Sequence, residues 1–235
     1  MVALLRILAL LCCLTALGNA RAQETRVRAS EAYDIGSNGV PRFVGTDYIE
    51  LAKIERISRF RSGVGHDYSD DFESCRSLKH YFQPSNTVSW ASIQIRSPVA
   101  GTVIRIEPET LAGGGTQVRI KSRDLPAFYF ILFHVRTNGQ VSVGDTLSAG
   151  QLLGTHIGSR STSDIAVGVT TPKGWKLVSY FDVMSDSLFA TYRARGLDSR
   201  TNAIISKEAR DADPLTCKGG RFATPGNLPN WVTLR

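Results

Sequence analysis

The stretch FYFILFHV, residues 128–135, is a continuous apolar run that contains one His, His134. A short run of this kind is typical of a strand that is buried on both faces. The segment TNGQ, residues 137–140, follows it as a turn. We therefore predict a central buried strand here and work outward from it.

Upstream of this strand, residues 89–108, SWASIQIRSPVAGTVIRIEP, alternate apolar and polar side chains and are interrupted by Pro98 and Gly101. This pattern predicts a strand, a turn and a second strand. TQVRIKS, residues 116–122, alternates again. The sequence therefore predicts further strands on the N-terminal side of the central strand.

Downstream, residues 141–158, VSVGDTLSAGQLLGTHIG, contain short strand-like pieces separated by Gly turns. Residues 163–178, SDIAVGVTTPKGWKLV, have the pattern of a hairpin. The region from Ser89 to Val178 is thus predicted to be mainly antiparallel β.

The flanking regions have a helical pattern. Near residue 50, Leu51, Ile54 and Ile57 recur every three residues after a capping-box-like Asp47–Glu50, which suits a helix but also suits a short buried strand near residues 57–60. After Asp182, Ser185 is a helix N-cap candidate, and residues 201–214 suit another short helix.

The N-terminus has the features of a secretory signal. Arg6 precedes an apolar run over residues 7–17, and Ala20-Arg21-Ala22 has the small-x-small form of a cleavage site. We predict a signal peptide over residues 1–22 and a secreted or periplasmic protein. The run is too short to be a comfortable membrane span, and no second apolar segment of membrane length follows.

The charge and the cysteine content indicate which partners and which covalent links the mature chain has. The 235-residue chain carries a formal charge of +7, which falls to +5 after cleavage. Its positive residues are scattered, which favours attraction to anionic surfaces such as bacterial wall polymers over nucleic-acid binding. Cys75 and Cys217 remain in the mature chain and are predicted to form a disulfide, although two separate buried thiols are the alternative.

Several stretches, in order, resemble the lysostaphin-like (LytM-type) zinc endopeptidase family. ISRFRS at 57–62, GHDYSD at 65–70, SPVAGTVIRI at 97–106, the central strand and residues 141–158 all follow that family's pattern. The resemblance runs from about Ile54 to Val169. It implies a LytM-type antiparallel β-sandwich or half-barrel over residues 48–182. The likeness does not extend to the flanks, where the polar composition predicts an N-terminal arm over 23–47 and the helical pattern predicts a C-terminal extension over 183–235.

The resemblance also implies a metal site. His66 and Asp70 correspond to the first two zinc ligands, and His134 corresponds to a catalytic His. The family's last His-x-His motif is replaced, because Asp164 stands at its first His and Ala166 at its second. A catalytic zinc needs three protein ligands and an open position for water, so the ligand set is incomplete.

Two residues are candidates to complete that set. His80 lies in an insertion close to the site in sequence, although a packing or surface His is the alternative interpretation, and Asp164 would need a shifted geometry. The remaining acidic residues, Asp67, Asp71 and Glu73, suit a solvated acidic turn, with calcium binding as an alternative.

Three functional hypotheses follow. The first is an exported, catalytically impaired LytM-like domain that binds cell-wall peptide or an envelope protein partner. The second is an active zinc endopeptidase that cleaves peptidoglycan cross-links or peptides, with a substituted third ligand and with His134 or Asp164 assisting catalysis. The third is a half-barrel interaction module whose acidic turn binds a structural metal. The sequence lacks a nucleophile elbow, a phosphate loop and zinc-finger Cys spacing.

Overall fold

The computed structural model describes residues 31–109, 114–158 and 161–235. The predicted signal peptide, residues 1–22, and the first part of the predicted arm, residues 23–30, lie outside the described residues. Within the described ranges, none of the helices is long and apolar enough to cross a membrane.

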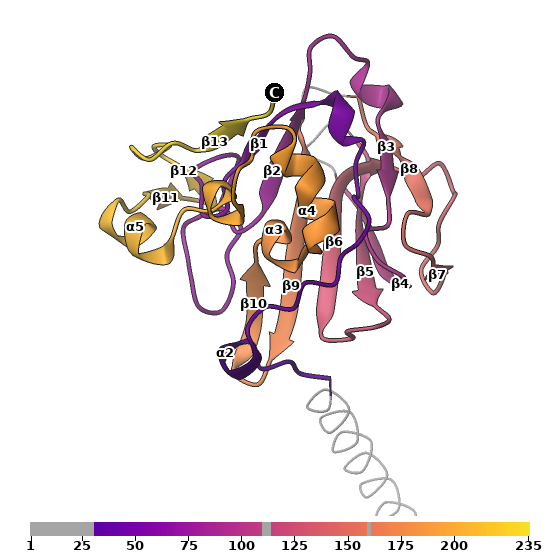
Figure 1. The fold of residues 1–235 in the computed structure, drawn as a ribbon, viewed down its shortest axis with the longest axis horizontal. Helices are drawn as coiled ribbons and strands as arrows, with labels where there is room; N and C mark the ends of the chain where they lie inside the picture. Colours follow the sequence, from indigo (N-terminus) through magenta and orange to yellow (C-terminus); the bar gives the residue numbers. More distant parts are fainter. Residues whose placement is uncertain (1–30, 110–113, 159–160) are drawn as a thin grey trace, which may run out of the picture.

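The described residues form an eleven-stranded antiparallel sheet and a small two-stranded sheet (Figure 1). The main path of the large sheet runs in the order β13-β1-β2-β9-β6-β5-β4-β7, with β10 paired to β9, and β8 paired to β3 and β6. Its strands are β1 (Ile54–Ser58), β2 (His80–Pro84), β3 (Gln94–Arg96), β4 (Gly101–Pro108), β5 (Thr116–Ser122), β6 (Phe128–Arg136), β7 (Thr146–Leu147), β8 (Leu152–His156), β9 (Ser163–Thr171), β10 (Gly174–Val178) and β13 (Trp231–Thr233).

The remaining elements are a small sheet and short helices. The two-stranded sheet pairs β11 (Cys217–Lys218) with β12 (Arg221–Phe222). The α-helices are α2 (Ile35–Asn38), α3 (Tyr180–Val183), α4 (Asp186–Arg193) and α5 (Lys207–Ala212), and the 3-10 helices are η1 (Leu51–Lys53), η2 (Trp90–Ser92) and η3 (Arg200–Ala203).

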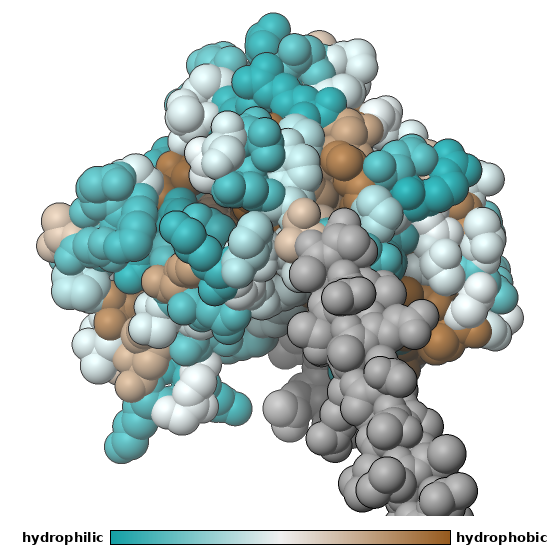
Figure 2. Space-filling view, turned by 90° about the horizontal axis from the view of Figure 1, so that it is seen from below, coloured by the Kyte–Doolittle hydropathy of each residue, from teal (hydrophilic) through white to brown (hydrophobic). Residues whose placement is uncertain are grey.

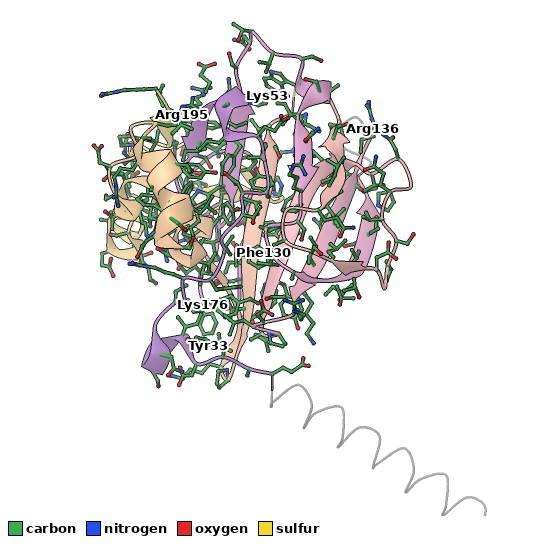
Figure 3. All side chains as sticks on the ribbon, turned by 45° about the vertical axis from the view of Figure 1, so that its right-hand side comes forward. Tyr33, Lys53, Phe130, Arg136, Lys176 and Arg195 are labelled. Carbon is green, nitrogen blue, oxygen red and sulfur yellow. A yellow bond between two sulfur atoms is a disulfide. The ribbon has the colours of Figure 1, made fainter. Side chains whose placement is uncertain are left out.

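The predicted central strand is β6, which lies between β5 and β9. Because side chains alternate along a strand, Phe128, Phe130 and Leu132 enter the larger apolar core, whereas Ile131 and Phe133 belong to a smaller cluster on the opposite face. Helices α3 and α4 pack over the face of the larger core (Figure 1), and Phe130 lies at the centre of the molecule (Figure 3). The strand is apolar throughout because both of its faces are covered.

The predicted fold class is confirmed: the chain is mainly β, antiparallel, with short C-terminal helices. Helix α4 begins after Ser185, whose hydroxyl accepts a hydrogen bond from the Leu188 N–H, as the capping pattern predicts. Near residue 50 a single 3-10 turn, η1, leads directly into β1, which covers Ile54–Ser58 and so begins earlier than the strand predicted near 57–60. Asp47 caps no helix, since its buried carboxylate accepts hydrogen bonds from the hydroxyls of Tyr180 and Tyr192.

The predicted disulfide is also present. Cys75 and Cys217 are joined across 142 residues of sequence. The bond ties the acidic segment before β2 to the two-stranded sheet near the C-terminus, and the backbone of His66 forms a bridge with Arg221 of β12. Figure 2 shows one face of the resulting surface, on which hydrophobic residues form separate patches among hydrophilic ones.

A buried ion-pair cluster as the candidate functional site

Three neighbouring strands bring charged side chains together on the sheet face of the smaller apolar cluster. Asp164 on β9 lies opposite Phe133 on β6 and opposite Tyr81 on β2. Lys79 immediately precedes β2, and His134 follows Phe133 with a φ of 59°. This left-handed backbone conformation interrupts the strand alternation, so the ring of His134 reaches the same carboxylate as Lys79.

The centre of the cluster is an ion pair between Lys79 and Asp164. The Lys79 Nζ lies 2.9 Å from the Asp164 Oδ2, and each side chain is only 1% exposed. Three aromatic rings surround the ammonium at 4.0 to 5.1 Å from their centroids, namely those of Tyr68, Tyr81 and Phe133. Such contacts stabilise a cation through the negative faces of the rings.

The pKa shifts of the pair follow from this arrangement. Burial by itself would lower the pKa of Lys79, but the Asp164 carboxylate outweighs burial and raises that pKa above its ordinary value. Burial likewise acts to raise the pKa of Asp164, but the charges of Lys79 and His134 outweigh it and lower that pKa. Both groups are therefore charged at neutral pH.

His66 contacts the same ammonium through its ring. Its Nδ1 lies 2.8 Å from the Asp67 carbonyl oxygen, which can only accept, so Nδ1 carries the proton. The lone pair of Nε2 then points to the Lys79 Nζ at 3.3 Å. Burial and the charge of Lys79 lower the pKa of His66, which keeps the ring neutral.

His134 lies between two carboxylates. Its Nε2 is 3.5 Å from the Asp164 Oδ2, and its Nδ1 is 2.9 Å from the Glu109 Oε2, which also accepts from the His134 backbone N–H at 2.8 Å. Burial acts to lower the pKa of His134, but the contacts with Asp164 and Glu109 raise it to about 9. The cluster thus holds two cations and two anions in alternation.

Asp70, one of the predicted metal ligands, is directed elsewhere. Its Oδ1 accepts from the backbone N–H groups of Phe72 and Glu73, and its Oδ2 accepts from the N–H of Leu177 in β10, all at 2.8 Å. The neighbouring Asp71 accepts from the Trp175 N–H at 2.7 Å. The two carboxylates therefore cover the outer edge of β10.

The rest of the acidic turn also has protein partners. Glu73 is 7% exposed and forms ion pairs with Arg61 and Arg76, so the expectation of a solvated turn is wrong for this residue. Asp67 accepts from the hydroxyl of Ser69 and from the Arg76 N–H. These carboxylates hold the turn together through internal donors.

His80, the predicted alternative ligand, lies in the sheet interior. Its Nδ1 donates to the Ser58 carbonyl and its Nε2 accepts from the Ser179 hydroxyl, both at 2.8 Å, and burial lowers its pKa to about 4. Both ring nitrogens are therefore occupied. The structure brings His66, His134 and Asp164 together around Lys79, and leaves Asp70 and His80 outside this cluster.

The residues present do not fit the zinc that the resemblance implies. In the ranges that the structure describes, no group of three or more His, Cys, Asp or Glu side chains could hold a metal ion. The space between the His66 Nε2 and the Asp164 Oδ2 is taken by the Lys79 ammonium, whose nitrogen cannot coordinate a metal while it is protonated.

Sequence reasoning missed Lys79 and Glu109. A Lys beside a His at the start of a strand is ordinarily assigned to the surface, because lysines are almost never fully buried unless paired. The available signal was the sequence SLKHYF, residues 77–82, in which Lys79 and Tyr81 share a strand face. That signal becomes informative only once Asp164 is known to lie opposite.

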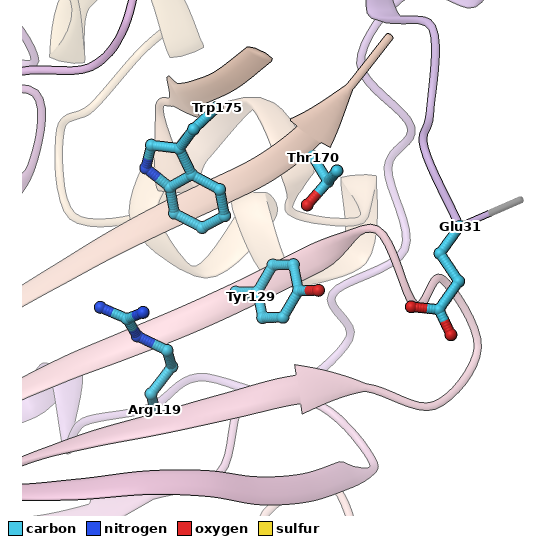
Figure 4. Close-up of a pocket in the computed structure, with 5 residues that line it drawn as sticks. All are labelled: Glu31, Arg119, Tyr129, Thr170 and Trp175. Carbon is cyan, nitrogen blue, oxygen red and sulfur yellow. The ribbon is translucent and has the colours of Figure 1, made fainter. Parts of the chain in front are cut away.

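Apolar side chains fill the sheet face beside the cluster. Ala166 is 1% exposed and packs in the smaller apolar cluster with Ile131 and Leu177, while Tyr68 and Trp175 pack against its margin. Beyond Trp175 lies a pocket of about 350 Å³, lined by Glu31, Arg119, Tyr129, Thr170 and Trp175 (Figure 4). The buried Lys79–Asp164 pair and this pocket occupy different parts of the same face.

No protein-family model matches the sequence, and no curated protein matches it. Among solved structures, the lysostaphin catalytic domain of Staphylococcus simulans aligns with 53% of this chain and 88% of its own, at 15% identity and a TM-score of 0.36. A structure of the SpoIIQ–SpoIIIAH pore-forming complex aligns with 66% of this chain and 97% of its own, at 10% identity and a TM-score of 0.37.

The solution structure of lysostaphin aligns with 51% of this chain at 14% identity and a TM-score of 0.34, and this chain spans 52% of that chain's length. These similarities are too low to carry an argument about activity. The structure itself shows a mainly β, disulfide-linked fold in which His66 and Asp164 both contact the ammonium of Lys79.

Proposed function

We propose that this chain is an exported LytM-like domain that does not cleave peptides and instead binds cell-wall peptide or an envelope protein partner. One observation carries the proposal. The Lys79 ammonium lies between the His66 Nε2 and the Asp164 Oδ2, where a ligated metal would be needed for peptidase chemistry.

The chemistry of an ammonium explains the loss of activity. A catalytic zinc lowers the pKa of its bound water by acting as a Lewis acid with an open coordination position. A protonated amine supplies positive charge, but it has no empty orbital to accept a water oxygen. The Lys79 side chain is itself only 1% exposed, so its ammonium fills this position instead of leaving it open to water.

The cluster has a structural role in this proposal. Lys79, Asp164, His134 and Glu109 link β2, β9, β6 and the segment after β4 through alternating charges. A buried ion pair constrains side-chain geometry, because separating its members leaves an unpaired charge in the interior. The scaffold is thereby kept rigid for binding through its outer surface.

The disulfide and the net charge support the location and the class of partner. Disulfides persist in oxidising compartments, which agrees with the predicted export of the chain. A positively charged mature chain is attracted to anionic wall polymers. No contact in the described ranges favours the alternative of an active enzyme, since both ring nitrogens of His80 and the Oδ2 of Asp164 already have protein partners.

Zinc content and peptide cleavage test the proposal directly. The purified mature chain is equilibrated with zinc, dialysed and analysed by mass spectrometry, beside a His66→Ala variant. We expect both proteins to hold far less than stoichiometric zinc and to leave peptidoglycan and pentaglycine peptides intact. Stoichiometric zinc that is lost in His66→Ala, together with cleavage, would establish the enzyme instead.

Binding is measured in parallel by sedimentation with purified peptidoglycan and by crosslinking to envelope extracts. We expect the folded chain to cosediment with peptidoglycan or to crosslink reproducibly to an envelope protein. A folded chain that does neither would contradict the binding part of the proposal.

A further inference from the structure

The pocket next to Trp175 is separate from the ion-pair cluster. Its lining comes from β5, β6, β9 and β10, with Glu31 closing one end (Figure 4). The buried Ala166 and Ile131 lie between the pocket and Asp164 along β9 and β6, where Ile131 is paired with Ala166 and Phe133 with Asp164. Apolar side chains therefore separate the pocket from the buried Lys79–Asp164 pair.

An aromatic wall forms one side of the pocket. Trp175 lies against β9 at Gly168, where an added Cβ would come within 1.9 Å of the indole Cζ2. Gly168 is paired with Tyr129 on β6, and the centroids of the Trp175 and Tyr129 rings are 5.4 Å apart. The glycine thus allows the indole to lie close to the sheet, next to the tyrosine.

Beside this wall lies Arg119, whose guanidinium forms no ion pair with any side chain that the structure describes. The Arg119 Nε is buried and has no hydrogen-bond partner among the described residues. Leaving a buried donor unsatisfied costs about 1–3 kcal/mol. Because this Nε is buried, a ligand in the pocket would accept from the two Nη groups, which form no hydrogen bond with the described residues.

The charged residues around Arg119 also favour a negatively charged ligand. Arg105 lies directly opposite Arg119 on β4, and like charges in such a pair are destabilising. Arg105 pairs with Glu107 at 2.6 Å, while the carboxylate in the pocket, Glu31, pairs with Lys121 at 2.6 Å. Glu31 and Glu107 are thus paired with other cations, which leaves the charge of Arg119 in the pocket without a carboxylate partner among the described residues.

We infer that this pocket binds the carboxylate of a short peptide segment, with Arg119 holding the two oxygens and with Tyr129 and Trp175 contacting the adjacent apolar group. A guanidinium matches a carboxylate through two parallel hydrogen bonds. The pocket volume of about 350 Å³ is at the small end of ligand sites, which suits the end of a chain. This inference rests on the proposed function and specifies the ligand of its binding surface.

Calorimetric titration of the folded mature chain tests the inference with three probes: acetyl-Ala-Ala-Ala with a free C-terminus, its C-terminal amide, and acetyl-Ala-Glu-Ala-amide. We expect binding of at least one carboxylate probe and no binding of the plain amide. Preference for the first probe assigns a terminal carboxylate, and preference for the third assigns a side-chain carboxylate.

Three variants locate the site. Arg119→Gln should weaken the binding at least tenfold, and Arg119→Lys should weaken it by less, because the charge remains but the paired hydrogen bonds are lost. Arg193→Gln, which removes an exposed arginine on α4, should leave the affinity within twofold of wild type. Circular dichroism confirms that each variant is folded.

Several outcomes would overturn the inference. They are no binding of either carboxylate probe at concentrations up to about 10 mM, equal binding of the amide, full competition by the same concentration of inorganic phosphate, or unchanged affinity in folded Arg119→Gln. None of these results involves zinc or cleavage. Failure of the pocket and failure of the non-peptidase proposal are therefore distinguishable.

Discussion

Lys79 shows how one residue changes the chemistry of a site. Its charge is paired with Asp164, its hydrogen bonds include His66, and its ammonium lies over the ring of Phe133. The Nε2 of His66, a residue that the sequence predicted to be a metal ligand, lies 3.3 Å from this ammonium. The same imidazole therefore accepts a hydrogen bond here and needs no metal to be satisfied.

Replacing Lys79 tests how much this ion pair contributes to the free energy of unfolding. Lys79→Met should lower the free energy of unfolding by about 3–5 kcal/mol, because Asp164 loses its closest cation in a buried site. Urea unfolding of the purified chain measures the change. The matched control is Lys121→Met, which breaks a partly exposed pair with Glu31 and should cost no more than about 1 kcal/mol. Equal losses in the two variants would contradict our account of the cluster.

The raised pKa of His134 predicts a pH dependence of stability. The folded chain holds this proton up to a pKa of about 9, whereas an unfolded His releases it near 6.5. The stabilisation is therefore complete below pH 6.5 and is lost as the pH rises toward 9. The total is on the order of 2–3 kcal/mol.

Urea unfolding between pH 6 and pH 10 measures this loss, with His134→Gln as the comparison. We expect the wild-type curve to fall across this window and the variant curve to be flatter by the contribution of the one titrating group. Parallel curves would show that the two carboxylates do not retain the proton on His134.

At the scale of elements, the acidic turn covers the outer edge of β10. Strand β10 pairs with β9 on one side, and its other side would otherwise expose backbone N–H groups. Asp70 and Asp71 accept from the N–H groups of Leu177 and Trp175 on that side. Covered edges protect a sheet from pairing with other chains.

Asp70→Ala should therefore act on stability and on exchange at the edge, whether or not metal is added. The variant leaves three backbone N–H groups without their acceptor, so we expect a loss of about 2–4 kcal/mol in the free energy of unfolding. Amide hydrogen exchange at Leu177 should become faster.

The control is Asp124→Ala, which removes an exposed carboxylate paired only with the neighbouring Arg123. It should change the free energy of unfolding by less than about 1 kcal/mol. If Asp70→Ala were as mild as this control, and if zinc binding were lost with it, the edge interpretation would be wrong.

At the scale of the whole molecule, the disulfide joins the acidic segment before β2 to the small sheet near the C-terminus. It closes a loop over a sequence separation of 142 residues, which strongly restricts the unfolded chain. The chain-entropy relation gives a stabilisation of about 4–5 kcal/mol for a loop of this length.

A double variant, Cys75→Ala with Cys217→Ala, should lose about 3–5 kcal/mol of unfolding free energy in urea titrations. Wild-type protein treated with a reductant should approach the same value, and the reductant should leave the double variant unchanged. A double variant as stable as oxidised wild type would show that the C-terminal region is held by its other contacts alone.

Much of the fold could be predicted from local patterns. The apolar run at 128–135 indicated a central strand because both faces of β6 are buried, and the alternation of residues 116–122 matched β5. Ser185 indicated the start of α4 because the cap hydrogen bond is made within one turn. These features depend on neighbours in sequence, so the sequence by itself determined them.

The tertiary structure alone decided the chemistry of the site. Lys79 and Asp164 are 85 residues apart, and they meet only because β2 and β9 are paired with one register. Asp70 matched a metal-ligand spacing, but its oxygens are used by backbone donors from its own turn and from β10. The physical reason is that spacing along a chain specifies which side chains are available, whereas strand pairing and burial determine which charge each of them must neutralise.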